Sequence, residues 1–181
     1  MGDKAKNLII LFPGMGYNVS NPLFYYARIK YAAKGFEIME TNYGDCILKD
    51  RSFDENIEAV KVYVLNQIKS ADLAAYDNVL FFSKSYGTVV AGLLENEVSV
   101  KVRHVFLTPL NGTLPFIAKG KNIDIVIAGT NDKYMEADNI KAHCEREGIR
   151  LELIAGADHS LVIHGDARAS VDALKKAVDL F

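Results

Sequence analysis

Short apolar runs rich in β-branched and aromatic residues recur along the chain, and segments with helical periodicity separate them. A strand that is apolar at every position is buried on both faces, which is typical of parallel sheets covered by helices. The alternation therefore predicts an α/β fold with right-handed crossover helices. We expect strands at Leu8–Phe12, Phe36–Thr41, Val79–Phe82, His104–Leu107, Ile123–Ala128 and Leu151–Ala155.

The segments between these runs carry residues that begin and end helices. Ser52 and Glu55 have the spacing of a capping box, in which each side chain accepts a hydrogen bond from the backbone N–H of the other. Apolar residues follow on one helical face, at Ile57, Val60 and Val64. The other expected boundaries are Asn21–Pro22 and Gly35 for the first helix, Tyr134 and Gly148 for a later one, and Asp166 for the last.

Composition and charge narrow the functional classes. With 181 residues the chain is long enough for one well-buried domain and too short for two ordinary ones, so we expect a single domain over residues 1–181. The net charge of −2 gives no electrostatic basis for binding nucleic acid or an anionic membrane. No apolar run reaches membrane-spanning length, and the run that ends at Phe12 is too short for the core of a signal peptide. We expect a cytoplasmic protein in which Cys46 and Cys144 are free thiols.

Small and polar residues gather in the loops that follow the apolar strands. Functional sites of parallel α/β sheets lie beyond the carboxyl ends of the strands. The loops after the third, fifth and sixth strands contain Ser85, Asp132 and His159, in that order along the chain. Ser85 has the position of a nucleophile on a sharp turn from a strand into a helix, because that turn lifts a hydroxyl above the sheet.

These loops together resemble those of the α/β-hydrolase superfamily, in particular its small lidless bacterial members. Ser83-x-Ser85-x-Gly87 is similar to the family's nucleophile elbow, G-x-S-x-G, with serine in place of the first glycine. Residues 129–132 resemble the acid loop, residues 157–160 the histidine loop, and residues 11–16 the oxyanion-hole segment. The resemblance covers nearly the whole chain. It implies a three-layer α/β/α fold without a cap domain, with six parallel strands in the order 2-1-3-4-5-6.

Acyl-transfer chemistry assigns a role to each of these residues. His159 takes the proton of the Ser85 hydroxyl, and Asp132 fixes the tautomer of the imidazole and stabilises the imidazolium. The backbone N–H groups of Met15 and Tyr86 form the oxyanion hole. In the family a lid usually follows the fourth strand, where this chain has little room for one. We therefore expect an open substrate cleft bordered by Tyr17, Tyr86, Leu114 and Phe116.

The expected activity is hydrolysis of a carboxylic ester or thioester of a small acyl group through an acyl-enzyme intermediate. Amide cleavage is less favoured because an amine is a poorer leaving group. We expect a small-molecule ester or thioester as the substrate, no cofactor, no metal, no nucleic acid and no membrane partner. The sequence leaves the oligomeric state open.

Several of the same residues allow other interpretations. Asp158 competes with Asp132 as the acid, although a residue adjacent to the histidine points away from it in an extended loop. Gly14 and Gly16 form part of a dinucleotide-binding pattern in which Val19 replaces the third glycine, and Asp45, Asp132, His159 and His164 form a metal set without a supporting spacing. A catalytically silent hydrolase fold that acts as a binding module is the remaining alternative. We expect Lys84 to be solvated in its turn and Ser83 to be a small packing residue.

Overall fold

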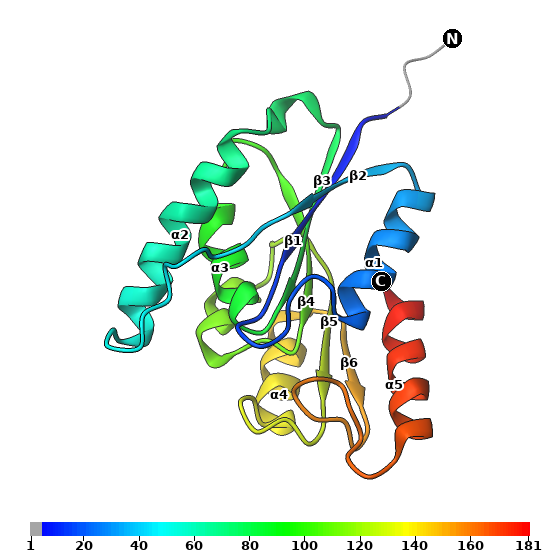
Figure 1. Cartoon of the computed structure of the whole chain (residues 1–181). Helices are drawn as coiled ribbons and strands as arrows, with labels where there is room; N and C mark the ends of the chain where they lie inside the picture. The colour runs from blue at the N-terminus through cyan, green and yellow to red at the C-terminus, as the bar shows by residue number, and fades with distance from the viewer. Residues whose placement is uncertain (1–4) are drawn as a thin grey trace.

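The computed structural model describes residues 5–181, which form a sheet of six parallel strands with helices on both faces (Figure 1). The strand order is β2-β1-β3-β4-β5-β6, and every pairing between neighbours is parallel. The expected fold class and strand order are therefore confirmed. The strands are β1 (Asn7–Phe12), β2 (Phe36–Glu40), β3 (Asn78–Lys84), β4 (Val102–Leu107), β5 (Ile123–Gly129) and β6 (Leu151–Ile154).

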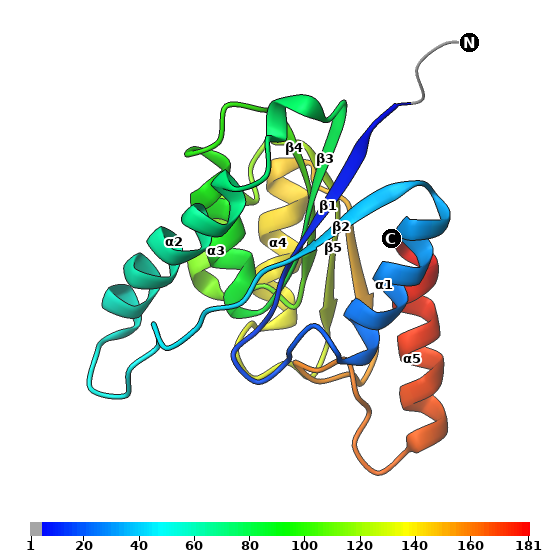
Figure 2. The same cartoon turned by 45° about the horizontal axis from the view of Figure 1, so that its top comes forward.

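The helices divide between the two faces of the sheet. Figures 1 and 2 show α1 (Pro22–Ala33) and α5 (Ala167–Leu180) side by side on one face. The opposite face carries α2 (Phe53–Lys69), α3 (Tyr86–Glu95) and α4 (Ala137–Glu147). Two short 3₁₀ helices, η1 (Leu73–Ala75) and η2 (Asn111–Phe116), lie in the connections that lead to β3 and β5.

Burial on both faces explains the continuous apolar strands. In β1, Ile9 and Leu11 pack into the core beneath α1 and α5, whereas Leu8 and Ile10 pack into the core beneath α2 and α3. Ile9, Ile10 and Leu11 are fully buried. Burying one such side chain stabilises the fold by roughly 1.5–3 kcal/mol, so a strand of this kind holds the two outer layers together.

Helix boundaries follow the local signals with two differences. The capping box is confirmed, since the Ser52 hydroxyl accepts from the Glu55 N–H (3.2 Å) and the Glu55 carboxylate accepts from the Ser52 N–H (2.8 Å). Asn21 precedes α1, but its side chain does not cap the helix. Helix α4 begins at Ala137 rather than near Tyr134, because the Tyr134 N–H donates to the Asp132 carboxylate (2.8 Å) instead of entering the helix.

The connections at the carboxyl ends of the strands determine where a site can form. The chain between β4 and β5 contains the six-residue helix η2. Of the helices in residues 5–181, none has the length and apolar character needed to cross a membrane. Because all six strands run parallel, the loops after β1, β3, β5 and β6 lie at the same edge of the sheet.

Candidate active site

Ser85 occupies a strained turn between β3 and α3. Its backbone has φ 54° and ψ −122°, in a region that residues with a side chain rarely adopt. Such a conformation costs on the order of 1–3 kcal/mol and persists only where the surroundings enforce it. Here the Ser85 N–H donates to the Leu107 carbonyl (3.0 Å), and the Ser85 carbonyl accepts from the Thr88 N–H (2.9 Å). The turn presents the hydroxyl beyond the end of the sheet.

Small residues on either side of Ser85 allow α3 to cross the end of β1. A Cβ atom at Gly87 would lie 2.3 Å from the Phe12 carbonyl oxygen and 2.5 Å from that of Pro13. Ser83 is fully buried, and its hydroxyl donates to the Val105 carbonyl (3.2 Å) within the sheet. The expectation that Ser83 is a packing residue is therefore confirmed.

A continuous chain of hydrogen bonds joins the three residues expected to form a triad. The Ser85 Oγ lies 2.7 Å from His159 Nε2, and His159 Nδ1 lies 2.7 Å from Asp132 Oδ2. A carboxylate only accepts hydrogen bonds, so Nδ1 carries the proton and Nε2 is free to accept from the serine. The Asp132 side chain is fully buried, whereas the imidazole remains partly exposed. This arrangement can draw a proton from the Ser85 hydroxyl.

Contacts between the acid loop and the histidine loop hold Asp132 and His159 next to each other. The Asn131 N–H donates to the Ala157 carbonyl (2.9 Å), and the Gly156 N–H donates to the Thr130 hydroxyl (2.8 Å). The two loops approach so closely at Gly129 that a Cβ atom there would lie 2.1 Å from the Ala157 carbonyl oxygen. Glycine at this position is a steric requirement of the site.

Asp158 has a different task from Asp132. One of its carboxylate oxygens accepts from the N–H groups of Ser160 (2.8 Å) and Val162 (2.9 Å), and the other lies 2.9 Å from His164 Nε2. Burial raises the pKa of the Asp158 carboxyl, but these hydrogen bonds and His164 outweigh burial and leave its pKa below the ordinary value. The carboxylate therefore orders its own loop, and its hydrogen bonds go to Ser160, Val162 and His164 rather than to the His159 imidazole.

A hollow of about 550 Å³ opens beside Ser85 and His159. Gly14 forms one side, because a Cβ atom there would lie 3.1 Å from the Ser85 Cβ. Met15 and Tyr86, whose N–H groups are the expected oxyanion donors, both line the hollow. The side chains that complete it are mainly aromatic or apolar: Tyr17, Phe53, Leu110 and Tyr134.

Solved structures with the same architecture identify the fold. A serine hydrolase homologue from Coxiella burnetii is 16% identical, with a TM-score of 0.65 over 97% of this chain and 85% of that chain. A serine hydrolase without a lid from Xanthomonas campestris is 17% identical, with a TM-score of 0.64 over 99% and 84%. Est1E from Butyrivibrio proteoclasticus, with ferulic acid bound, is 13% identical, with a TM-score of 0.64 over 99% and 91%.

The chain has the α/β-hydrolase fold. No protein-family model and no curated protein matches its sequence. At these identities the likeness concerns the fold, so the activity has to be argued from the site itself.

Two of the residues expected to border the cleft lie elsewhere. Leu114 and Phe116, on η2, pack against the core beneath α4 together with Phe106, Ile117 and Val126. The η2 helix turns toward α3 rather than toward Ser85, as shown by the Phe116 ring, which lies where a Cβ atom at Gly92 would be (2.3 Å). The prediction for these two residues is wrong.

The hydrolase fold brings to the site two aromatic side chains that sequence reasoning missed. Phe53 is the first residue of α2, and its ring lies 5.5 Å from the ring of Tyr86. Tyr134 is 63% exposed, and its ring lies 4.7 Å from the His159 ring. Tyr134 follows Asp132 by two residues, a proximity that could have marked it, whereas no local signal marks Phe53.

Lys84 is buried, in contrast to the solvated position expected for it. Only 1% of this residue is exposed, and its side chain runs beneath the site instead of out of the turn. The reason is that β3 continues through Lys84, so its side chain points to the face of the sheet opposite that of Ser83 and is covered there.

The metal and dinucleotide interpretations find no matching geometry in residues 5–181. Within residues 5–181, no three His, Cys, Asp or Glu side chains are grouped closely enough to hold a metal ion. In dinucleotide-binding folds the glycine loop leads directly into a helix. Here α1 begins only at Pro22, and Gly14 lies against Ser85.

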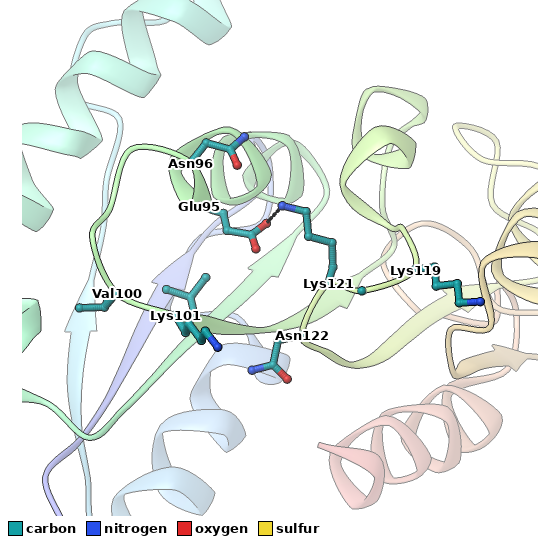
Figure 3. Close-up of a pocket in the computed structure, with 9 residues that line it drawn as sticks. Glu95, Asn96, Val100, Lys101, Lys119, Lys121 and Asn122 are labelled. Carbon is teal, nitrogen blue, oxygen red and sulfur yellow. Dashed lines mark ion pairs between the residues drawn. The ribbon is translucent and has the colours of Figure 1, made fainter.

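A second hollow, of about 710 Å³, lies at the opposite end of the sheet, where β4 and β5 begin (Figure 3). Its charges do not converge on a common point. Lys121 reaches the Glu95 carboxylate (2.9 Å), whereas Lys119 points away from the hollow. None of the residues that line it is a serine, cysteine or histidine. This hollow therefore lacks the hydroxyl and imidazole groups that line the hollow beside Ser85 and His159.

Proposed function

We propose that the protein is a serine hydrolase that cleaves a carboxylic ester or thioester of a small acyl group through an acyl-enzyme intermediate. The observation that carries this proposal is the hydrogen-bonded chain from Ser85 through His159 to Asp132, at 2.7 Å for each step. Its serine end faces the hollow, and its carboxylate end is buried.

The first half of the reaction transfers the acyl group to Ser85. The Ser85 Oγ attacks the carbonyl carbon while His159 Nε2 takes the hydroxyl proton. The N–H groups of Met15 and Tyr86 stabilise the resulting oxyanion, and loss of one such donor costs roughly 3–4 kcal/mol of barrier. When the tetrahedral intermediate collapses, the C–O or C–S bond breaks and His159 gives its proton to the leaving alcohol or thiol.

The second half of the reaction repeats the same proton transfers with water. His159 takes a proton from a water molecule, whose oxygen attacks the acyl carbonyl. A second oxyanion forms in the same place, and its collapse releases the carboxylic acid as Ser85 regains its proton from His159. The buried Asp132 carboxylate stabilises the imidazolium in both halves. Apart from the substrate and one water molecule, both halves use only groups of this chain.

The shape of the site favours a small acyl group. The hollow of about 550 Å³ is within the ordinary range for ligand sites, roughly 300–1,000 Å³. Rings of Tyr17, Phe53 and Tyr134 surround it and offer apolar area close to Ser85. Ferulic acid, bound in Est1E, is a carboxylic acid, the class of product that ester hydrolysis releases.

A fluorophosphonate probe followed by mass spectrometry tests the proposal. We expect a covalent adduct on the peptide that contains Ser85, and loss of both labelling and ester hydrolysis in Ser85→Ala. Ser83→Ala is the matched control, because Ser83 lies two residues away and its hydroxyl serves the sheet. An adduct on Ser83 would contradict the assignment. Absence of labelling together with absence of hydrolysis across a panel of esters and thioesters would favour the catalytically silent fold.

A further inference from the structure

Lys84, the residue before the proposed nucleophile, holds a buried ammonium group directly beneath the site. Its Nζ donates to the Thr108 hydroxyl (3.0 Å) and to the backbone carbonyl of His159 (2.8 Å). The same atom lies 4.5 Å from the centre of the Tyr17 ring, within the range of a cation–π contact. One side chain thus contacts the loops that follow β1, β4 and β6.

Stability alone does not account for a lysine at this position. Both hydrogen-bond acceptors of the ammonium are neutral oxygens, and removing a charge from water costs several kcal/mol. Lysine is almost never fully buried unless it is paired with an opposite charge. A buried lysine that is costly to the fold, and that adjoins the reactive serine, calls for a functional explanation.

The contacts of Lys84 span the distance that catalysis must control. Its backbone joins Ser85, and its ammonium holds the backbone of His159, so one residue links the two groups that exchange the proton. Thr108, the other anchor, is fully buried and has a left-handed φ of 41°, which places its hydroxyl in a fixed position. A displacement of about 1 Å between reacting groups can reduce a rate by about 100-fold.

We propose that Lys84 is a positioning residue that tethers the backbone of His159 to the nucleophile turn and opposes protonation of the imidazole through its charge. This inference rests on the proposed serine hydrolase function. The tether fixes the height of Nε2 over the Ser85 hydroxyl. The positive charge makes an imidazolium less favourable before substrate binds, which keeps His159 available as a base.

The effect of the Lys84 charge on the pH dependence of kcat/KM is predicted for a site in which the other groups near His159 are unchanged. Burial lowers the pKa of the Lys84 ammonium to about 8, although Asp132 and Asp158 raise it, so the lysine is charged below that pH. Removing this charge shifts the acid limb of the kcat/KM profile to higher pH. A substitution at Lys84 leaves the other groups near the imidazole or its loop unchanged: Asp132, Ser85, Tyr134, Asp158 and His164.

The test uses Lys84→Met, with Lys69→Met as the matched control on the exposed end of α2. For a short acyl ester we expect kcat of Lys84→Met to fall about 10- to 100-fold, with KM nearly unchanged. The acid limb should move to higher pH, and the thermal midpoint should not fall. Lys69→Met should match the wild type in all four measurements. A merely structural lysine would lower the thermal midpoint and leave the acid limb in place.

A second variant, Thr108→Ala, separates the tether from the charge. It removes one anchor and leaves the ammonium, so kcat should fall while the acid limb stays in place. This variant also decides the matter if Lys84→Met does not fold. The inference is wrong if both kcat and the acid limb of Lys84→Met match those of the wild type. If Lys84→Met does not fold, the inference is wrong if the kcat of Thr108→Ala matches that of the wild type. If the wild type itself neither reacts with the phosphonate nor hydrolyses esters, the proposed function fails and the inference falls with it.

Discussion

At the scale of single residues, the site depends on how each charged group is satisfied. The Asp132 carboxylate accepts from the Tyr134 N–H on one oxygen and from His159 on the other, in a fully buried position. Asp158 uses its oxygens for the N–H groups of its own loop and for His164. Two aspartates in neighbouring loops thus have separate tasks.

Exchanging these two carboxylates for amides tests that division. We expect Asp132→Asn to fold and to lose roughly three to four orders of magnitude in kcat, because the amide favours the wrong imidazole tautomer. Asp158→Asn should show a far smaller loss in kcat. Steady-state kinetics on one ester substrate, with circular dichroism to check folding, decides between them. Reversed effects would show that Asp158 is the acid of the triad.

Lys84 also predicts how stability depends on pH. Its pKa is about 8 in the folded protein and 10.5 in the unfolded chain, so between these values the unfolded chain binds the additional proton. Stability therefore rises with pH through this window, with each pKa unit corresponding to about 1.4 kcal/mol. Below pH 8 the destabilising contribution of the buried charge is present in full.

Lys84→Met lacks this contribution, so its thermal midpoint relative to that of the wild type should be highest near neutral pH. We expect the difference to shift in favour of the wild type as the pH is raised from about 7 to about 10. Thermal unfolding of both proteins across this range measures it. A difference that stays constant would show that Lys84 titrates as an exposed lysine does, and a shift in favour of the variant would show that folding raises the pKa of Lys84.

At the scale of elements, the crossing of α3 over the end of β1 fixes the reactive turn. Gly87 lies at this crossing, where a Cβ atom would lie 2.3 Å from a backbone oxygen of Phe12. Backbone atoms cannot move aside as the end of a flexible side chain can. The strand and the helix would have to separate, and the loop after β1 that carries Met15 would move with them.

Gly87→Ala should therefore destabilise the fold strongly, by about 3 kcal/mol. Gly16→Ala is the matched control in the neighbouring loop, because no heavy atom lies within 4 Å of the Cβ position at Gly16. We expect the stability of Gly16→Ala to stay within about 0.5 kcal/mol of the wild type. Urea unfolding of both variants gives the comparison. Equal stabilities would mean that α3 is free to shift from β1.

At the scale of the whole molecule, the site lies on the edge of the sheet where the loops after β1, β3, β5 and β6 meet. The chain between β4 and β5 is short, and its 3₁₀ helix η2 packs against α3 and the core beneath α4. Exposed side chains, among them Met15 at 62%, Phe53 at 47% and Tyr134 at 63%, surround the hollow.

Under the proposed function, we expect a site of this kind to bury only a short acyl chain. Each buried methylene contributes about 0.8 kcal/mol, and this gain ends where the chain leaves the hollow. We expect kcat/KM for a series of esters of increasing acyl length to level off early, with no rise in rate when the substrate forms an oil–water interface. A steady increase through the longest acyl chains, or interfacial activation, would show that part of the protein closes over the substrate.

The sequence by itself determined the strands, the capping box of α2, the turn at Ser85 and the order of the three loops that carry serine, aspartate and histidine. These features depend on residues close together in the chain, because periodic burial and turn geometry are local properties. The strand order came from the resemblance, and the structure confirms it.

The tertiary structure alone decided which side chains meet. From the sequence, Lys84 is expected to be a solvated turn residue. Its hydrogen-bond acceptors, Thr108 and His159, come from the end of β4 and the histidine loop, which only the fold brings next to it. Phe53 lines the hollow from the start of α2, whereas Phe116 packs against α3 at Gly92. Side chains far apart in sequence become neighbours only through the packing of whole elements. Local periodicity does not predict that packing, because it depends only on residues close together in the chain.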